Sequence, residues 1–85
     1  MEAIAVYAGS FDPVTNGHLD LIERASPLFK KLVVAVGVNP RKPAAFSLED
    51  RLDMLRRVTA HIPNVEVDSF DGLLVDYAKS IGAKA

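Results

Sequence analysis

The chain has 85 residues, which is enough for one small domain at most. Its 10 basic and 11 acidic residues give a net charge of −1, so it lacks the cationic surplus that drives non-specific binding to nucleic acid. The absence of cysteine excludes a disulfide framework and a cysteine zinc site. The apolar stretches are too short to cross a bilayer, and Glu2 stands where a signal peptide carries positive charge. We therefore expect a soluble, cytoplasmic protein without a nucleic-acid or membrane partner.

The first half of the chain alternates between apolar strand patterns and a helical pattern. We expect a strand over about residues 3–8 and a helix over about 17–29, with Pro27 kinking or shortening the end of that helix. A second strand, residues 32–38, is apolar at nearly every position. Continuous apolar strands are typical of a parallel sheet that is covered on both faces.

The second half continues this alternation. Ser47 can cap a helix whose apolar positions recur from residue 48 to residue 62. A short strand over 65–68 and a helix over 73–81 follow, and Gly82 suits the C-terminal cap of that last helix. The order βαβαβα predicts an α/β fold, with parallel strands joined by right-handed crossovers.

Small and polar residues gather where the first strand gives way to the first helix. Gly9 lets a ligand approach the backbone, and the Ser10 hydroxyl can donate to a phosphate oxygen. Gly17 removes a side chain where a phosphate would meet the helix amides, and His18 can donate to the same phosphate. Each residue alone fits an ordinary turn or a surface histidine. Together, in a β-loop-α unit, they predict a phosphate site at the carboxyl end of a strand.

The ordered set also resembles a known family. Residues 9–13 (Gly-Ser-Phe-Asp-Pro) and 15–18 (Thr-Asn-Gly-His) are similar to the signature of the nucleotidylyltransferases, whose motif is H/T-x-G-H. A threonine at the first motif position is typical of the phosphopantetheine adenylyltransferases in that family. The resemblance continues through residues 39–42, 46–51 and 72–75. It implies a Rossmann-like parallel sheet that forms the N-terminal portion of a five-stranded, dinucleotide-binding-like fold.

The resemblance also implies a reaction. These enzymes transfer the adenylyl group of ATP to phosphopantetheine, which gives dephospho-coenzyme A and pyrophosphate, a step of coenzyme A synthesis. By resemblance, His18 is the catalytic residue and contacts the α-phosphate, while Gly9, Ser10 and Phe11 meet ATP. Ser10 would also hold the attacking phosphate in line. Magnesium would help to neutralise the triphosphate, although no local cluster of metal ligands occurs in the sequence and we assign no metal-binding residue.

Two further residues are assigned to the acceptor substrate. Lys42 would meet the phosphate of phosphopantetheine and Leu74 its pantetheine arm, although a solvated lysine and an ordinary core leucine are the alternatives. Arg41 is expected to face solvent. The helical arginines Arg51 and Arg57, with Arg56, are expected in surface pairs or subunit contacts.

Relatives in this family are longer, and usually hexameric. We therefore expect residues 1–85 to be a single truncated domain with half an active site and poor turnover alone, from a protein that forms homo-oligomers. The family's sheet places the first strand between the second and a fourth, so that strand should here be an exposed edge. Two alternatives stay open. One is a nucleotidylyltransferase with nicotinamide mononucleotide or glycerol phosphate as acceptor, and the other is a non-catalytic folding or assembly fragment.

Overall fold

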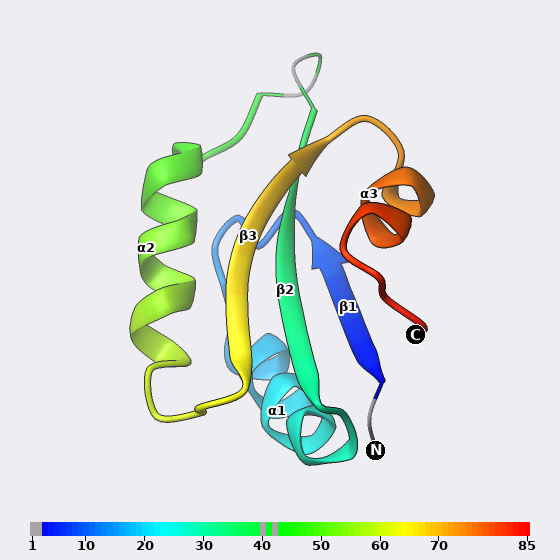
Figure 1. The fold of residues 1–85 in the computed structure, drawn as a ribbon. Coiled ribbons are helices and arrows are strands. Elements are labelled where there is room, and N and C mark those ends of the chain that lie inside the picture. The colour runs from blue at the N-terminus through cyan, green and yellow to red at the C-terminus, as the bar shows by residue number, and fades with distance from the viewer. Residues whose placement is uncertain (1–2, 40, 42) are drawn as a thin grey trace.

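The computed structural model describes residues 3–39, 41 and 43–85. One parallel sheet holds β1 (Ile4–Gly9), β2 (Lys31–Val38) and β3 (Val65–Asp71), in the order β1-β2-β3. Between and after the strands come α1 (Asn16–Ala25), a short 3₁₀ helix η1 (Ser26–Leu28), α2 (Leu48–Val58) and α3 (Leu74–Ser80). Figure 1 shows the resulting βαβαβα order, which confirms the predicted α/β class.

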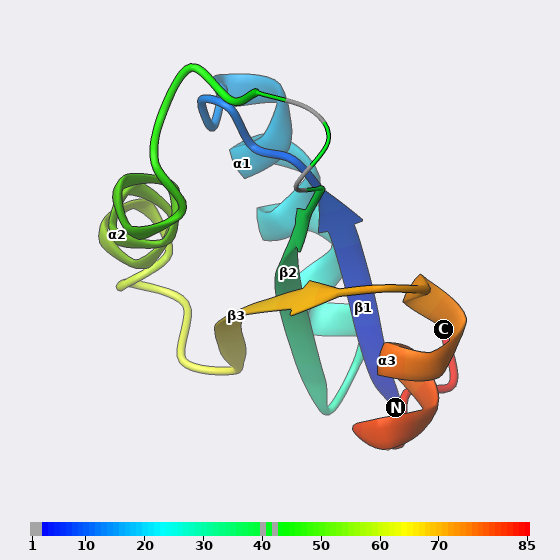
Figure 2. The ribbon, with the colours of Figure 1, turned by 90° about the horizontal axis from the view of Figure 1, so that it is seen from above.

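Helices lie on both faces of the sheet (Figures 1 and 2). On one face, Ile22 of α1 and Leu55 of α2 are fully buried against Val34 and Val36 of β2. On the other face, α3 packs beside β3. The central strand β2 is buried from Leu32 to Val36, so its continuous apolar sequence correctly predicted a strand covered on both sides.

Several element ends follow from local chemistry. Pro27 lies in η1, where α1 has already ended at Ala25, as the proline predicted. The Ser47 hydroxyl accepts a hydrogen bond from the Asp50 amide and caps α2. Beyond α3, the amides of Gly82 and Ala83 donate to the carbonyls of Lys79 and Ala78, which is a Schellman motif with Gly82 at a φ of 75°.

Two predicted boundaries were wrong. Helix α2 ends at Val58 rather than at residue 62, because the backbone of Thr59 leaves the helical region at a ψ of 4°. Strand β3 continues to Asp71 rather than ending at residue 68, because Ser69, Phe70 and Asp71 pair with the last residues of β2. That pairing depends on a neighbouring strand, which a local pattern does not contain.

Strands β1 and β3 form the two edges of the three-stranded sheet, and β1 was expected at an edge. Residues 84 and 85 nevertheless form hydrogen bonds with the first residues of β1. The Lys84 amide donates to the Ile4 carbonyl at 2.8 Å, and the Val6 amide donates to the Ala85 carbonyl at 2.9 Å. Residues 84–85 therefore bond to the side of β1 that faces away from β2. None of the helices in the described part of the chain has the length and apolarity that crossing a membrane requires.

Candidate active site

The loop after β1 is anchored by Phe11. Its side chain is 1% exposed, and its ring meets the ring of Tyr7 edge-on with centroids 5.3 Å apart. The backbone of Phe11 has a φ of 47°, a left-handed conformation that costs of order 1–3 kcal/mol outside glycine. Burial of the ring offsets this cost. A Cβ on Gly9 would lie 3.3 Å from the ring, so Gly9 leaves room for Phe11 as well as exposing its own backbone.

His18 closes the first turn of α1 as part of a capping box. The Thr15 amide donates to Nδ1 of His18 at 2.9 Å, while the Thr15 hydroxyl accepts from the His18 amide at 3.3 Å. A backbone amide can only donate, so Nδ1 is an acceptor and the neutral ring carries its proton on Nε2. The ring also meets Phe11 edge-on with centroids 4.9 Å apart. The cap thus holds the imidazole in one orientation with Nε2–H as its donor.

A broad cleft of about 980 Å³ lies where the strands end. Its lining comes from the ends of all three strands, the loops that follow them and the start of α3: Ala8, Gly9, Ser10, Gly37, Val38, Asn39, Arg41, Phe70, Gly72, Leu73 and Leu74. Leu74 is 45% exposed and Leu73 67% exposed, so Leu74 is not the ordinary core leucine of the alternative interpretation. Arg41 is exposed, as expected, but it also lines the cleft.

A second hollow, of about 260 Å³, shares Ser10 with the cleft. Asp12 and Arg51 line it, together with residues of the loop that leads into α2. Arg51 is only 7% exposed, and its guanidinium donates to the Ser10 carbonyl at 3.0 Å. The expectation of a surface role for Arg51 was therefore wrong, because its position in the helix turns it toward the loop after β1.

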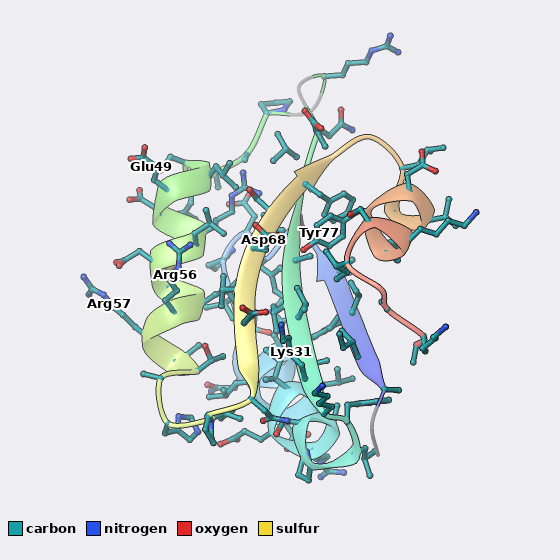
Figure 3. All side chains as sticks on the ribbon, in the orientation of Figure 1. Lys31, Glu49, Arg56, Arg57, Asp68 and Tyr77 are labelled. Atoms are coloured by element: carbon teal, nitrogen blue, oxygen red, sulfur yellow. The ribbon has the colours of Figure 1, made fainter. Side chains whose placement is uncertain are left out.

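Unlike Arg51, the neighbouring Arg56 and Arg57 lie at the surface. Arg57 pairs with Asp53 at 2.9 Å on the outer side of α2, as expected of a surface pair. Figure 3 shows Arg57 pointing away from the sheet, and Arg56 is also exposed.

The predicted site residues are brought together only in part. Gly9, Ser10 and Leu74 line one cleft, although Leu74 follows Ser10 by more than sixty positions in the sequence. Phe11 lies beneath the loop with its ring buried, so that only its backbone is available to a ligand. The His18 ring packs edge-on against the Phe11 ring, and His18 is not among the residues that line the cleft. The assignment of Lys42 falls outside the described residues.

Sequence reasoning missed the contributions of Leu73, Phe70 and Arg51 to this region. Phe70 stacks on Tyr77 of α3 with centroids 4.9 Å apart, so α3 supports the wall of the cleft. Figure 3 shows Tyr77 directed toward Asp68, and its hydroxyl donates to that carboxylate at 2.7 Å. Burial, followed by the hydrogen bond to Asp68 and its charge, raises the pKa of Tyr77 well above its ordinary value. The apolar alternation of Val65 and Val67 does not continue to Phe70, so residues 65–71 carried no sequence signal for its place in the cleft.

The described residues do not build a metal site of their own. No group of three or more His, Asp or Glu side chains among them is placed to hold a metal ion. The nearest carboxylate to Ser10 in sequence, Asp12, already accepts two backbone amides.

Three curated proteins of similar sequence carry the same name. The phosphopantetheine adenylyltransferase of Carboxydothermus hydrogenoformans is 59% identical over 81 residues, covering 95% of this chain and 50% of the relative. That of Caldanaerobacter subterraneus subsp. tengcongensis is 58% identical over 82 residues, covering 96% and 51%. That of Desulfatibacillum aliphaticivorans is 56% identical over 85 residues, covering 100% and 49%. The chain thus spans about half the length of these curated relatives, and the predicted resemblance to phosphopantetheine adenylyltransferases is confirmed.

A solved structure shows the same fold. A bifunctional NMN adenylyltransferase/ADP ribose pyrophosphatase from Francisella tularensis, in complex with AMP and a manganese ion, matches with a TM-score of 0.64 and 25% identity. The match covers 96% of this chain and 26% of that one, which confirms the Rossmann-like arrangement. The sequence model of the family described as cytidylyltransferase-like matches residues 6–85, nearly the whole length. The chain therefore belongs to the cytidylyltransferase-like family.

Proposed function

We propose that this chain forms the part of a phosphopantetheine adenylyltransferase that holds the acceptor and meets the phosphates of ATP. The cleft carries this proposal. Its lining combines polar residues, Ser10, Asn39 and Arg41, with apolar ones that include Leu73 and Leu74. Phosphopantetheine combines the same two characters, because a phosphate ends a long and largely uncharged arm. The identities of 56–59% to enzymes of that name support the same choice.

The proposed reaction is an in-line substitution at phosphorus. An oxygen of the phosphopantetheine phosphate forms a bond to the α-phosphorus of ATP. The bond from that phosphorus to the bridging oxygen breaks, and pyrophosphate leaves with the electron pair. The attacking phosphate is already an anion, so alignment and charge stabilisation are required rather than a strong base.

The chain's own residues have distinct tasks in this scheme. The Ser10 hydroxyl, exposed at the edge of the cleft, donates to the acceptor phosphate and holds it in line. The Nε2 proton of His18 is directed by the capping box and donates to the α-phosphate as charge builds there. Leu74 contacts the pantetheine arm, and Lys42 is retained as the proposed cationic contact to the acceptor. We propose that ATP binds as its magnesium complex in the cytoplasm.

We also propose a homo-oligomer. Helix α1 presents Leu21, 47% exposed, and η1 presents Leu28, 58% exposed. They line one hollow together with Gly17, Ala25 and the paired side chains of Asp20 and Arg24, and exposed leucines in such a hollow suit a contact between subunits.

A hybrid enzyme would test the activity. Residues 1–85 would be joined to the second half of the Carboxydothermus hydrogenoformans protein, which the present chain does not cover. Pyrophosphate release from ATP would be measured with phosphopantetheine, nicotinamide mononucleotide, glycerol phosphate or no acceptor. We expect release only with phosphopantetheine, and little release by the 85-residue chain alone.

The comparison between acceptors also separates the remaining alternatives. Preference for nicotinamide mononucleotide would place the chain with the other adenylyltransferases, of which the Francisella tularensis protein is one. A folded hybrid that is inactive with every acceptor would favour a non-catalytic role. Near-native turnover by the chain alone would contradict the idea that it supplies only part of a site.

A further inference from the structure

Two loops that are far apart in sequence lie against each other beside Ser10. One is the loop after β1, and the other, residues 43–47, leads into α2. We propose that Asp12 and Arg51 form a clasp between these loops and act as positioning residues for Ser10. This inference rests on the proposed function, because Ser10 must be held in line with ATP for its position to matter.

Asp12 supplies the first half of the clasp. Its Oδ2 accepts from the Ala45 amide at 2.7 Å, and its Oδ1 accepts from the Phe46 amide at 2.8 Å. Hydrogen bonds to a carboxylate are stronger than neutral ones, and here both oxygens are used. An asparagine offers only one acceptor oxygen and would turn its NH₂ group toward the second amide. The pair of bonds therefore requires a carboxylate.

Arg51 supplies the second half from the first turns of α2. Its Nη1 donates to the Ser10 carbonyl at 3.0 Å, and its Nε donates to the Ser47 carbonyl at 3.3 Å. The guanidinium thus joins the backbone of Ser10 to the cap of α2. A lysine ammonium lacks the planar fork that reaches two carbonyls in this way. With the side chain 7% exposed, these bonds form where water competes little for them.

Apart from the buried Phe11, these loops lie largely at the surface in the described part of the chain. Residues 43–47 are all exposed, as are Ser10 and Pro13, and Phe11 is the loop residue that is buried in the core. A hollow of about 260 Å³, lined in part by Ser10, Asp12, Ala44 and Arg51, adjoins both loops. Loss of the clasp would therefore let the Ser10 hydroxyl move. A displacement near 1 Å can cost about 100-fold in rate when the reaction depends on alignment.

The first experiment tests the clasp in the unsubstituted 85-residue chain by amide hydrogen exchange. The Ala45 and Phe46 amides should exchange slowly although both residues are exposed. The Ala44 amide, in the same exposed segment, serves as the internal reference. Exchange of all three at the same fast rate would overturn the proposal without any substitution.

The second experiment tests positioning in the hybrid enzyme with Asp12→Asn and Arg51→Lys. We expect kcat to fall about 10- to 100-fold while the KM for ATP changes less than about threefold. Asp53→Asn and Arg57→Lys make the same chemical changes in an exposed pair on α2 and should leave kcat unaltered. Unchanged kcat in the clasp variants would overturn the positioning role. So would a loss of activity that merely follows a loss of folded protein in thermal unfolding.

The two experiments also separate this inference from the proposed function. An unsubstituted hybrid that is inactive with every acceptor refutes the function, and the positioning role falls with it, whatever the exchange rates are. An active hybrid whose clasp variants keep full kcat refutes the positioning role alone.

Discussion

Replacing His18 by glutamine or by alanine should separate its structural task from its catalytic one. His18 occupies the third helical position of α1, where its Nδ1 accepts from the Thr15 amide. Glutamine is a common residue at this position of a capping box, because its side-chain oxygen can accept the same hydrogen bond. Alanine cannot. The two substitutions therefore differ in the cap, whereas both remove the imidazole donor.

The contacts of His18 set the expected losses of stability and of kcat. Alanine loses one hydrogen bond, about 0.5–1.5 kcal/mol, and the edge contact with the Phe11 ring at 4.9 Å, which contributes about 0.5–1.5 kcal/mol. His18→Ala should therefore lower the free energy of unfolding by about 1–3 kcal/mol, and His18→Gln by about half of that. For catalysis, loss of one donor to a developing anion costs about 10²–10³ in kcat, so both variants should lose activity to a similar extent.

Two measurements check this prediction. Urea unfolding of the 85-residue chain gives the free energies, and steady-state kinetics of the hybrid enzyme give kcat and the KM for ATP. Equal destabilisation by glutamine and alanine would refute the assignment of Nδ1 as the acceptor in the cap. A kcat that survives both substitutions would refute the contact between His18 and the α-phosphate.

Three other outcomes are expected. Leu55→Ala, at a fully buried position, should lower the free energy of unfolding by about 2–5 kcal/mol in urea unfolding, and a loss below about 1 kcal/mol would mean that α2 packs differently. The raised pKa of Tyr77 means that the folded state disfavours its ionised form, so the stability it contributes is complete below about pH 10 and is lost as the pH rises above that. Tyr77→Phe should flatten this alkaline loss in a pH series of thermal unfolding, and an unaltered slope would contradict the role of Tyr77. Leu74→Ser, at a position 45% exposed, should raise the KM for phosphopantetheine with little change in stability or in the KM for ATP, whereas equal changes in both KM values would exclude a specific contact with the pantetheine arm.

Local patterns predicted most of the elements because their causes are local. The apolar run of β2, the Ser47 cap and the Gly82 terminus each depend on residues within a few positions, and the structure confirms them. The boundaries that were wrong depend on other segments. Strand β3 extends to Asp71 because β2 continues beside it, and no pattern in 65–71 alone contains that partner.

The candidate site likewise has features that depend on neighbouring residues and features that depend on distant segments. The residue types from Gly9 to His18 predict a phosphate-binding loop, because the amides at the start of a helix, together with hydroxyl and imidazole donors, suit phosphate oxygens. The sequence could not show that Phe11 would be buried beneath that loop, or that Arg51 would turn inward to the Ser10 carbonyl. An arginine on an amphipathic helix is ordinarily solvated, and only the position of a distant loop decides otherwise.

The sequence by itself thus determined the βαβαβα order, the family and the loop that carries Ser10 and His18, because each is encoded in contiguous residues. The tertiary structure alone decided that Leu74 and Ser10 share a cleft and that Asp12 reaches the amides of Ala45 and Phe46. The reason is physical. Parallel strands bring their carboxyl ends to one edge of the sheet, so groups that are dozens of residues apart become neighbours only when the strands pair.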